Sequence, residues 1–365
     1  MVAASGLFAQ TDPLERLKSE VARVKALPDE KTDGEAANLH RALRDWIESR
    51  LPGDKGLLHV GMPRAEAVMR SELKEAGLEG EGPDLRFQQL PELPNTLLVI
   101  VGVSVPCGVE EAVYLYQFDA TSRTRALEDR PLGYGFAKVE LSQPDSEGRR
   151  LLLTTHQSVQ CASAWVGMAY SVHRFGMLPG LPEKLLSVEH GFYLDDNSPS
   201  FGLTPDGLVV EFMHSSVDVD YLIRTHVYNY GFKGGVHRRD PVALQPQDFV
   251  EEWLTRPWRE MQSRSVPETK GMYDELHADF VLGHYDKVKP CAGRWLISLD
   301  IDHIGEKDLA KPRRTYFLVR ELSKYRYRME SVSEEEPSGC PGKGISLETH
   351  PWLTPAEIRA IPKDN

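Results

Sequence analysis

The chain lacks the features that mark several large classes of protein. It has no run of about 18 or more consecutive apolar residues, so we expect no membrane-spanning helix. It also lacks an excess of positive charge, because 43 Lys and Arg stand against 55 Asp and Glu, a net charge of -12. An acidic balance of this size argues against nucleic acid or an anionic membrane surface as the main partner.

Sequence motifs for common cofactors and catalytic machinery are missing too. We find no GxGxxG, GxxxxGK[ST], HExxH, EF-hand or GxSxG pattern, and each of these supplies a phosphate cradle, a ligand pair or a nucleophile that its chemistry requires. The stretch Gly342, Lys343, Gly344 lacks both the earlier glycine and the hydroxyl residue of a phosphate loop. We therefore expect no cofactor and no metal site, and a flexible C-terminal tail over 336–365.

Cysteine is scarce, and its spacing is uninformative about metals. The four residues Cys107, Cys161, Cys291 and Cys340 include no CxxC pair, which excludes a paired zinc knuckle. An even number permits two disulfides, and four buried free thiols are the alternative.

The first ten residues, MVAASGLFAQ, resemble the end of a secretory signal peptide, with small and apolar residues up to Ala9. A charged region before them is missing, so a plain apolar N-terminus is the alternative. Residues 1–10 thus predict a signal-peptide remnant and a periplasmic or extracellular location.

What the chain does contain is enough apolar material, 41% of 365 residues, for roughly two domains. Residues 11–80 show apolar positions with a helical period, and Asp12 and Pro13 suit the start of a first helix. This pattern predicts an N-terminal helical segment that serves packing.

From 86 to 335 the composition changes to β-branched and aromatic clusters separated by turn residues. Four similar blocks appear, each an apolar strand start followed by a second strand: LLVIVGVSVPC from 97, LLLTTHQSVQC from 151, LVVEFMHSSVD from 208 and VLGHYDKVKPC from 281. An apolar helical stripe over 247–262 reads as an insertion in the third interval. We predict a mainly β protein (α+β overall) with a propeller-like antiparallel β-repeat of about four units, or alternatively an antiparallel β-sandwich.

The third block differs from the others in its polar residues. It has Asp218 where the others have Cys, and Asp220 follows two positions later. The next strand alternates so that one face carries a guanidinium, an imidazole and two phenols, with two further polar residues on the strand before it. These residues are Arg224, His226, Tyr228 and Tyr230, preceded by Glu211 and His214.

Such a face can hydrogen-bond and stack on a polar ligand through Arg224, Tyr228 and Tyr230, with Trp165 as a further, exposed stacking surface. If the protein is an enzyme, Asp218 and Asp220 can serve as acid and base. His214 or His226 would then assist. The competing interpretation is an ordinary polar strand face and two turn-forming aspartates.

Because catalytic motifs are absent, we expect a binding or scaffold protein for a polar small molecule, a glycan or a protein. The alternative is a hydrolase that acts on a glycan or ester through the aspartate pair. A structural component of the cell envelope is a third possibility. Convergence of the side chains on one deep pocket, with two carboxylates about 5 to 10 Å apart, would favour the enzyme.

Overall fold

The computed structural model describes most of the chain in two compact units, residues 1–190 and 191–365, which we treat separately. The described residues are 12–26, 33–51, 62–75, 84–93, 95–105, 108–118, 123–131, 133–158, 163–176, 181–194, 199–218, 223–232, 237–238, 242–303, 312–341, 343–345, 353–354 and 356–357. The suspected signal-peptide remnant, residues 1–10, lies outside them.

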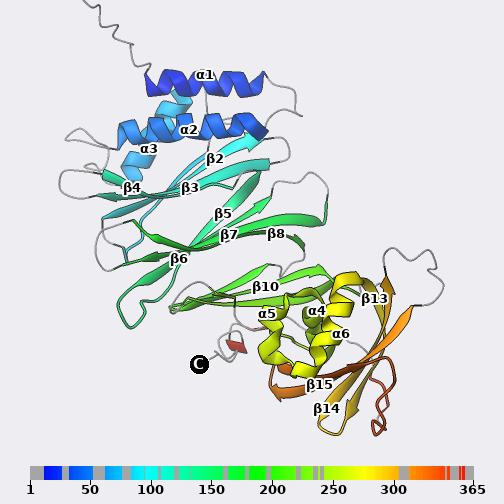
Figure 1. Cartoon of the computed structure of the whole chain (residues 1–365). Helices are drawn as coiled ribbons and strands as arrows, with labels where there is room; N and C mark the ends of the chain where they lie inside the picture. The colour runs from blue at the N-terminus through cyan, green and yellow to red at the C-terminus, as the bar shows by residue number, and fades with distance from the viewer. Residues whose placement is uncertain are drawn as a thin grey trace, which may run out of the picture. The chain divides into compact units, whose positions relative to one another are not determined.

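The first unit begins with the predicted helical segment (Figure 1). Its helices are α1 (Pro13–Lys25), α2 (Asp33–Arg50) and α3 (Met62–Glu75). Asp12 caps α1 as expected, because its Oδ1 accepts a hydrogen bond of 3.1 Å from the backbone N–H of Leu14. Proline in the first turn costs no hydrogen bond there.

Two antiparallel sheets follow in the first unit. The first sheet has the order β1-β2-β3-β4, and the strands β5, β6, β7 and β8 are likewise neighbours in chain order. The strands are β1 (Asp84–Gln88), β2 (Thr96–Val105), β3 (Gly108–Phe118), β4 (Arg123–Asp129), β5 (Tyr134–Leu141), β6 (Arg150–Ser158), β7 (Trp165–Phe175) and β8 (Glu183–Tyr193).

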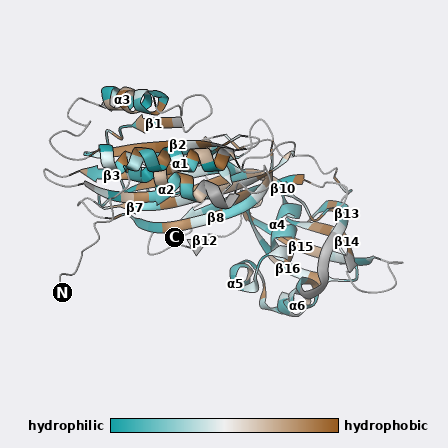
Figure 2. Cartoon of the chain, turned by 90° about the horizontal axis from the view of Figure 1, so that it is seen from above, coloured by the Kyte–Doolittle hydropathy of each residue, from teal (hydrophilic) through white to brown (hydrophobic). Residues whose placement is uncertain are grey.

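The first sheet is buried on both faces, and this explains its nearly continuous apolar sequence. Alternate residues such as Val99 pack against Leu43 and Trp46 of α2, while Leu98 packs towards Leu152 of β6. Figure 2 shows the resulting apolar colouring along β2. The first unit therefore stacks helices, a sheet and a second sheet, and the contact of two sheets is the sandwich element of our alternative prediction.

The second unit contains the remaining strands and a helical insertion. Its strands are β9 (Ser200–Thr204), β10 (Gly207–Ser215), β11 (Ile223–Gly231), β12 (His237–Arg238), β13 (Phe280–Cys291), β14 (Arg294–His303), β15 (Arg313–Ser323) and β16 (Arg326–Ser333). β10 pairs with β11 on one edge, and on the other with β9 and with Tyr193 at the end of β8. β13 to β16 form a four-stranded antiparallel sheet in chain order.

The predicted insertion is helical and longer than expected. It comprises α4 (Pro246–Thr255), α5 (Trp258–Met261), two short 3-10 turns (Gln262–Arg264 and Pro267–Thr269) and α6 (Lys270–Asp279). Phe249 and Trp253 of α4 pack on Ile297 and Phe317 of the last sheet, so the apolar stripe of the insertion forms part of the core.

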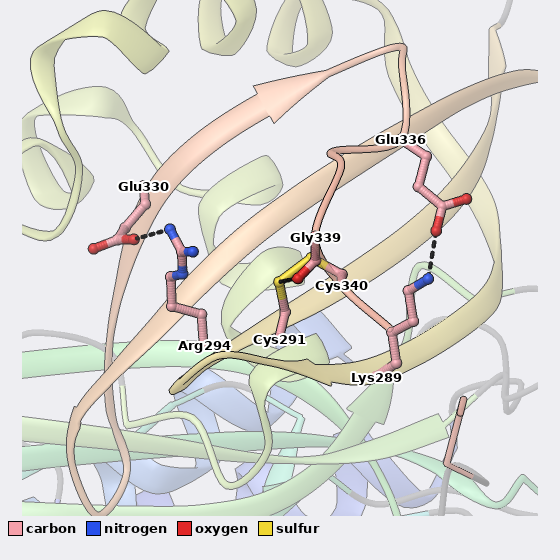
Figure 3. The surroundings of a disulfide bond; sticks show 7 residues. All are labelled: Lys289, Cys291, Arg294, Glu330, Glu336, Gly339 and Cys340. Carbon is pink, nitrogen blue, oxygen red and sulfur yellow. Dashed lines mark hydrogen bonds and ion pairs between the residues drawn. A yellow bond between two sulfur atoms is a disulfide. The ribbon is translucent and has the colours of Figure 1, made fainter. Parts of the chain in front are cut away.

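A disulfide joins Cys291 at the end of β13 to Cys340 in the C-terminal region (Figure 3). It lies in a small apolar cluster with Leu296 and Leu318, on the face of the sheet opposite Ile297. Ile345 is also fixed, because its N–H donates to the carbonyl of Val288 at 2.7 Å. The C-terminal segment is thus attached to the fold at these points. Cys107 and Cys161 lie outside the described residues.

The prediction of a mainly β fold built from repeated antiparallel units behind a helical segment is confirmed. Each of the four sequence blocks starts an antiparallel hairpin: β2–β3, β6–β7, β10–β11 and β13–β14. Among the described residues, the first and last sheets have four strands each, the size of a propeller blade, whereas β5 to β12 belong to one eight-stranded sheet. In the last sheet the hairpin is the first pair of strands instead of the middle pair.

Candidate functional site

The predicted polar face of β11 exists. Tyr228 lies next to His226 and Tyr230, with ring centroids 6.4 Å apart in both pairs. From β10, His214 pairs with Arg224 in the register and its ring lies 5.7 Å from that of His226. The alternation of the strand therefore brings these five side chains together as the sequence indicated.

Arg224 is the centre of this face, and its partners come from the helical insertion. Its Nε lies 2.7 Å from Oε1 of Glu251, and its Nη2 lies 3.0 Å from Oε1 of Glu252. The three side chains are between 4% and 12% exposed. Arg256 forms a second buried ion pair with Glu252. The polar face is therefore an interface with α4 and not a solvated strand surface.

The electrostatics of the cluster favour fixed charges. Burial disfavours the charged form of Glu252, but Arg256, His226 and Arg224 outweigh it and hold the pKa of that carboxyl well below its ordinary value. Burial opposes the charge of Arg224 as well, yet Glu251 and Glu252 raise its pKa. For His226 burial prevails, aided by Arg224, and its pKa is lowered although Glu251 and Glu252 act to raise it.

One carboxyl at the edge of the cluster behaves differently. Burial raises the pKa of Asp248 to about 6, although Arg224 acts to lower it. Its Oδ2 accepts a hydrogen bond of 2.9 Å from the N–H of Gln245 at the start of α4. Asp248 thus has a capping role in the helix, and its pKa is raised by burial and, to a smaller extent, by the neighbouring Glu251 and Glu252.

The remaining groups of the face also have partners within the fold. Nε2 of His226 lies 3.1 Å from the carbonyl oxygen of Ser215. The guanidinium of Arg256 lies 5.4 Å from the ring centroid of Tyr228, a cation-π distance. Tyr230 is only 5% exposed. Arg224, His226 and Tyr228 therefore attach α4, and the Arg256 that follows it, to β11.

The aspartate pair is placed only in part. Asp218 is 2% exposed, its N–H donates to the Ser216 hydroxyl at 3.1 Å, and its Oδ1 lies 4.0 Å from Nδ1 of His284. Asp220 lies outside the described residues. The proposed acid and base therefore have one buried member and one whose position is open.

The grouping of Glu211 with His214 is wrong. In the register of β10, Glu211 pairs with Val227 and His214 with Arg224, and residues three apart in a strand face opposite sides. Glu211 is completely buried on the far face, where its Oε1 accepts the N–H of Leu353 at 3.0 Å.

Trp165 belongs to the first unit, at the start of β7, and is 40% exposed. Sequence reasoning missed Phe136 of β5, which is 59% exposed and has a φ of 52°, unusual for an aromatic residue. The pairing of β5 with β6 shifts between Gly135 and Lys138, so Phe136 sits in a bulge, which re-aims a side chain. The flanking glycine and the aromatic residue were the available signal.

Trp165 and Phe136 lie at the same end of three neighbouring strands. Gly135 pairs with Gln157 near the end of β6, and the N–H of Gly167 donates to Oγ of Ser158 at 2.7 Å. Trp165, two residues before Gly167, and Phe136 thus flank that end of β6. We call Phe136, Tyr134, Ser158 and Trp165 the aromatic end.

A Cβ on Gly167 would lie 2.9 Å from the phenol oxygen of Tyr134 and 3.0 Å from Ser158. Only glycine leaves room for Tyr134 to cross β6 at this point. Glycine at position 167 therefore allows the Tyr134 phenol to lie against β6 and β7.

A second polar cluster that the sequence did not reveal lies inside the first unit. The carboxylate of Asp129 accepts from the hydroxyl of Thr154, lies 3.4 Å from Oγ of Ser171, and lies 3.5 Å from Nε2 of His156. Burial would raise the pKa of Asp129, but the hydrogen bonds from His156 and Thr154 lower it. All four residues are at most 9% exposed, so the cluster is an internal network.

Within the described ranges, no group of three or more His, Cys, Asp or Glu residues is arranged to hold a metal ion. The same part of the chain contains no helix that is both long and apolar enough to cross a membrane.

Comparison with known proteins does not identify a family. No family model matches the sequence, and no curated protein matches it. Among solved structures, a tryptophan-to-alanine mutant of the Synechocystis apocarotenoid oxygenase aligns over 67% of this chain and 68% of its own, with 8% identity and a TM-score of 0.20. A score this low does not establish a shared fold.

Proposed function

We propose that the chain is an extracytoplasmic binding protein for a polar, ring-bearing ligand such as a glycan, and that the aromatic end of the first unit contacts it. The supporting observation is the pair of large exposed rings, Phe136 at 59% and Trp165 at 40%, on strands that flank the end of β6. Aromatic rings beside hydroxyl groups suit ligands with both apolar faces and polar edges.

The strained backbone at Phe136 supports a role for its side chain. A positive φ costs an aromatic residue roughly 1 to 2 kcal/mol, and such conformations cluster at ligand-binding positions. Gly135 immediately precedes Phe136 and Gly133 lies three positions before it, so a residue suited to that conformation is adjacent on one side. Keeping the aromatic residue at the bulge therefore favours a function for the exposed ring.

The structure supports a binding function more than a hydrolase activity, because the proposed catalytic side chains that it describes are buried or engaged within the fold. Arg224 is engaged with Glu251 and Glu252, and Asp218 is 2% exposed. A general acid or base must reach its substrate, directly or through one water. Arg224 and Tyr228 are engaged with α4 and with the Arg256 that follows it, which suits them to holding the helix more than a ligand.

The Cys291–Cys340 disulfide supports a periplasmic or extracellular location, because disulfides persist mainly in oxidising compartments. Our proposal of secretion rests on this bond together with the apolar character of residues 1–10.

A binding screen tests the proposal. The full chain is titrated against soluble cell-wall and plant glycans by calorimetry, alongside Trp165→Ala, Phe136→Ala and the control Leu322→Ala, an exposed apolar residue of the second unit at 52%. Loss of one stacking contact of about 0.5 to 1.5 kcal/mol predicts a roughly 2- to 10-fold weaker affinity for each aromatic variant.

The control variant should bind like the parent. If the Trp165→Ala, Phe136→Ala double variant binds with the same affinity as the parent, the ligand does not bind at the aromatic end. Release of new reducing ends or acids from any screened substrate would favour the hydrolase instead.

A further inference from the structure

The C-terminal segment of the chain docks on the far face of β10 and β11. Leu353 is 6% exposed and lies 142 positions from its hydrogen-bond partner Glu211. It packs in a cluster of buried apolar residues of the second unit, and we call the residues around it the apolar pocket. The pocket residues are Val209, Val227, Val242, Leu244 and Tyr325.

A short turn continues the contact beyond Leu353. The carboxylate of Glu357 accepts from the N–H of Thr354 at 2.9 Å and from its hydroxyl at 3.0 Å. Glu357 also lies 3.5 Å from Nζ of Lys324, in the turn between β15 and β16. We call the described residues 353–354 and 356–357 the strap.

The centre of the pocket is a buried carboxyl group. Glu211 has no exposed surface, its Oε1 accepts the Leu353 N–H at 3.0 Å, and its Oε2 has no hydrogen-bond partner. The Ser200 hydroxyl of β9 faces the same carboxyl without completing a hydrogen bond of normal geometry. A buried carboxylate with one oxygen unsatisfied is costly, whereas the neutral acid is tolerated.

The charged groups around Glu211 add to this preference. Burial raises the pKa of Glu211 to about 7; the Leu353 N–H and Ser200 act to lower it, and Glu357 acts to raise it. Lys324 faces Glu357 at the edge of the strap.

We propose that the strap is proton-dependent: it stays on the apolar pocket while Glu211 is neutral and is released as Glu211 ionises. Release uncovers Val209 and Val227 and lets the carboxylate reach water. This inference is independent of the aromatic end, which belongs to the other unit.

The direction of the effect follows from linkage. The docked state keeps its proton up to a pH of about 7, whereas an exposed glutamate loses it near 4.5, so the docked state binds more protons between these values. Docking therefore weakens as pH rises through this window, roughly 10-fold per pH unit and about 300-fold in total, and is constant above it.

Hydrogen exchange of the full chain measures this directly. Peptides that include Leu353 are followed from pH 5 to 8.5, and each rate is divided by the intrinsic rate at that pH. We expect protection of the strap to fall with rising pH and to level off near pH 7. Leu353→Ala should lower protection at every pH because the pocket loses its occupant.

Two variants separate proton linkage from simple packing. Glu211→Gln keeps the size and an acceptor for the Leu353 N–H but cannot ionise, so its strap protection should not vary with pH. Glu357→Gln removes a nearby negative charge, so the levelling point should move to lower pH. A flat profile in the parent, or an unchanged profile in Glu211→Gln, overturns the proposal.

If Glu211→Gln leaves the strap undocked at all pH values, the other variant decides. A levelling point that moves down in Glu357→Gln supports proton linkage. If the levelling point of Glu357→Gln does not move while the strap remains docked, proton linkage is contradicted.

Discussion

Replacing Arg224 by Met should loosen the attachment of α4 to β10 and β11. The change removes two ion pairs, Nε to Glu251 at 2.7 Å and Nη2 to Glu252 at 3.0 Å. Glu252 keeps its contact with Arg256, so the uncompensated charge falls on Glu251. Glu251 still accepts a hydrogen bond of 2.9 Å from the Ser216 hydroxyl, which reduces the free-energy cost of losing Arg224.

Removal of one partner from a buried pair costs about 3 to 5 kcal/mol, and because Glu251 retains a hydrogen-bond donor we expect about 3 kcal/mol. This corresponds to roughly a 100-fold increase in the opening equilibrium of the α4 contact. Adding Glu251→Gln should recover most of the loss, because the double variant no longer buries an unpaired charge.

Hydrogen exchange of peptides from α4 and β11 is the appropriate assay, since a chain of two units has no single free energy of unfolding. Arg314→Met is the matched control, because Arg314 pairs with Asp300 at 2.7 Å while its side chain is 44% exposed. Exposed pairs contribute about 1 kcal/mol or less. Equal protection in Arg224→Met and the control, or no recovery on adding Glu251→Gln, would refute the reasoning.

Three further outcomes are expected. Burial lowers the pKa of His40 to about 3 and that of His173 to about 4, so the unfolded chain binds more protons below pH 6.5. The free energy of unfolding of the first unit should therefore fall as pH drops from 6.5 towards 4, by about 1.4 kcal/mol per pH unit for each histidine, and His40→Leu should halve the slope in urea titrations. Reduction of the Cys291–Cys340 bond, which closes a 49-residue separation, should destabilise the second unit by about 4 kcal/mol, as seen in denaturant midpoints with and without reductant. Phe136→Gly should slow exchange in β5 by relieving about 1 kcal/mol of backbone strain while weakening ligand binding, and faster exchange would contradict the strain argument.

The alternation of β11 was predictable, but its burial was not. Period-2 patterning places Arg224 and His226 on one face whatever covers that face. The covering element, α4, is selected by docking of a distant segment, which local patterning does not encode. Glu251 and Glu252 carried a signal, because two adjacent acids stand between apolar residues in a helix that forms core. Acids in such a position need buried partners.

The face on which Glu211 lies could have been obtained from the sequence, since residues three apart in a strand, such as Glu211 and His214, point to opposite faces. Its hydrogen-bond partner, Leu353, could not be predicted. The strap follows a segment rich in glycine and proline, and composition of that kind gives no indication that Leu353 is anchored in a pocket formed mostly by residues more than 100 positions away. Long-range docking of a single apolar residue leaves no periodic trace, because one residue has no period.

The correspondence between Asp218 and Cys291 in the sequence repeat reflects packing more than chemistry. Both residues end an apolar strand start, and both are 2% exposed. A small side chain is what such a buried position requires, and Asp and Cys are similar in size. The carboxylate adds a charge, which Asp218 places 4.0 Å from His284 of β13, and the backbone of the same segment bonds β13 through Val217 and Gly283. The third block therefore differs from the others because its strand end meets another sheet, and this accounts for its polar residue without requiring a catalytic carboxylate.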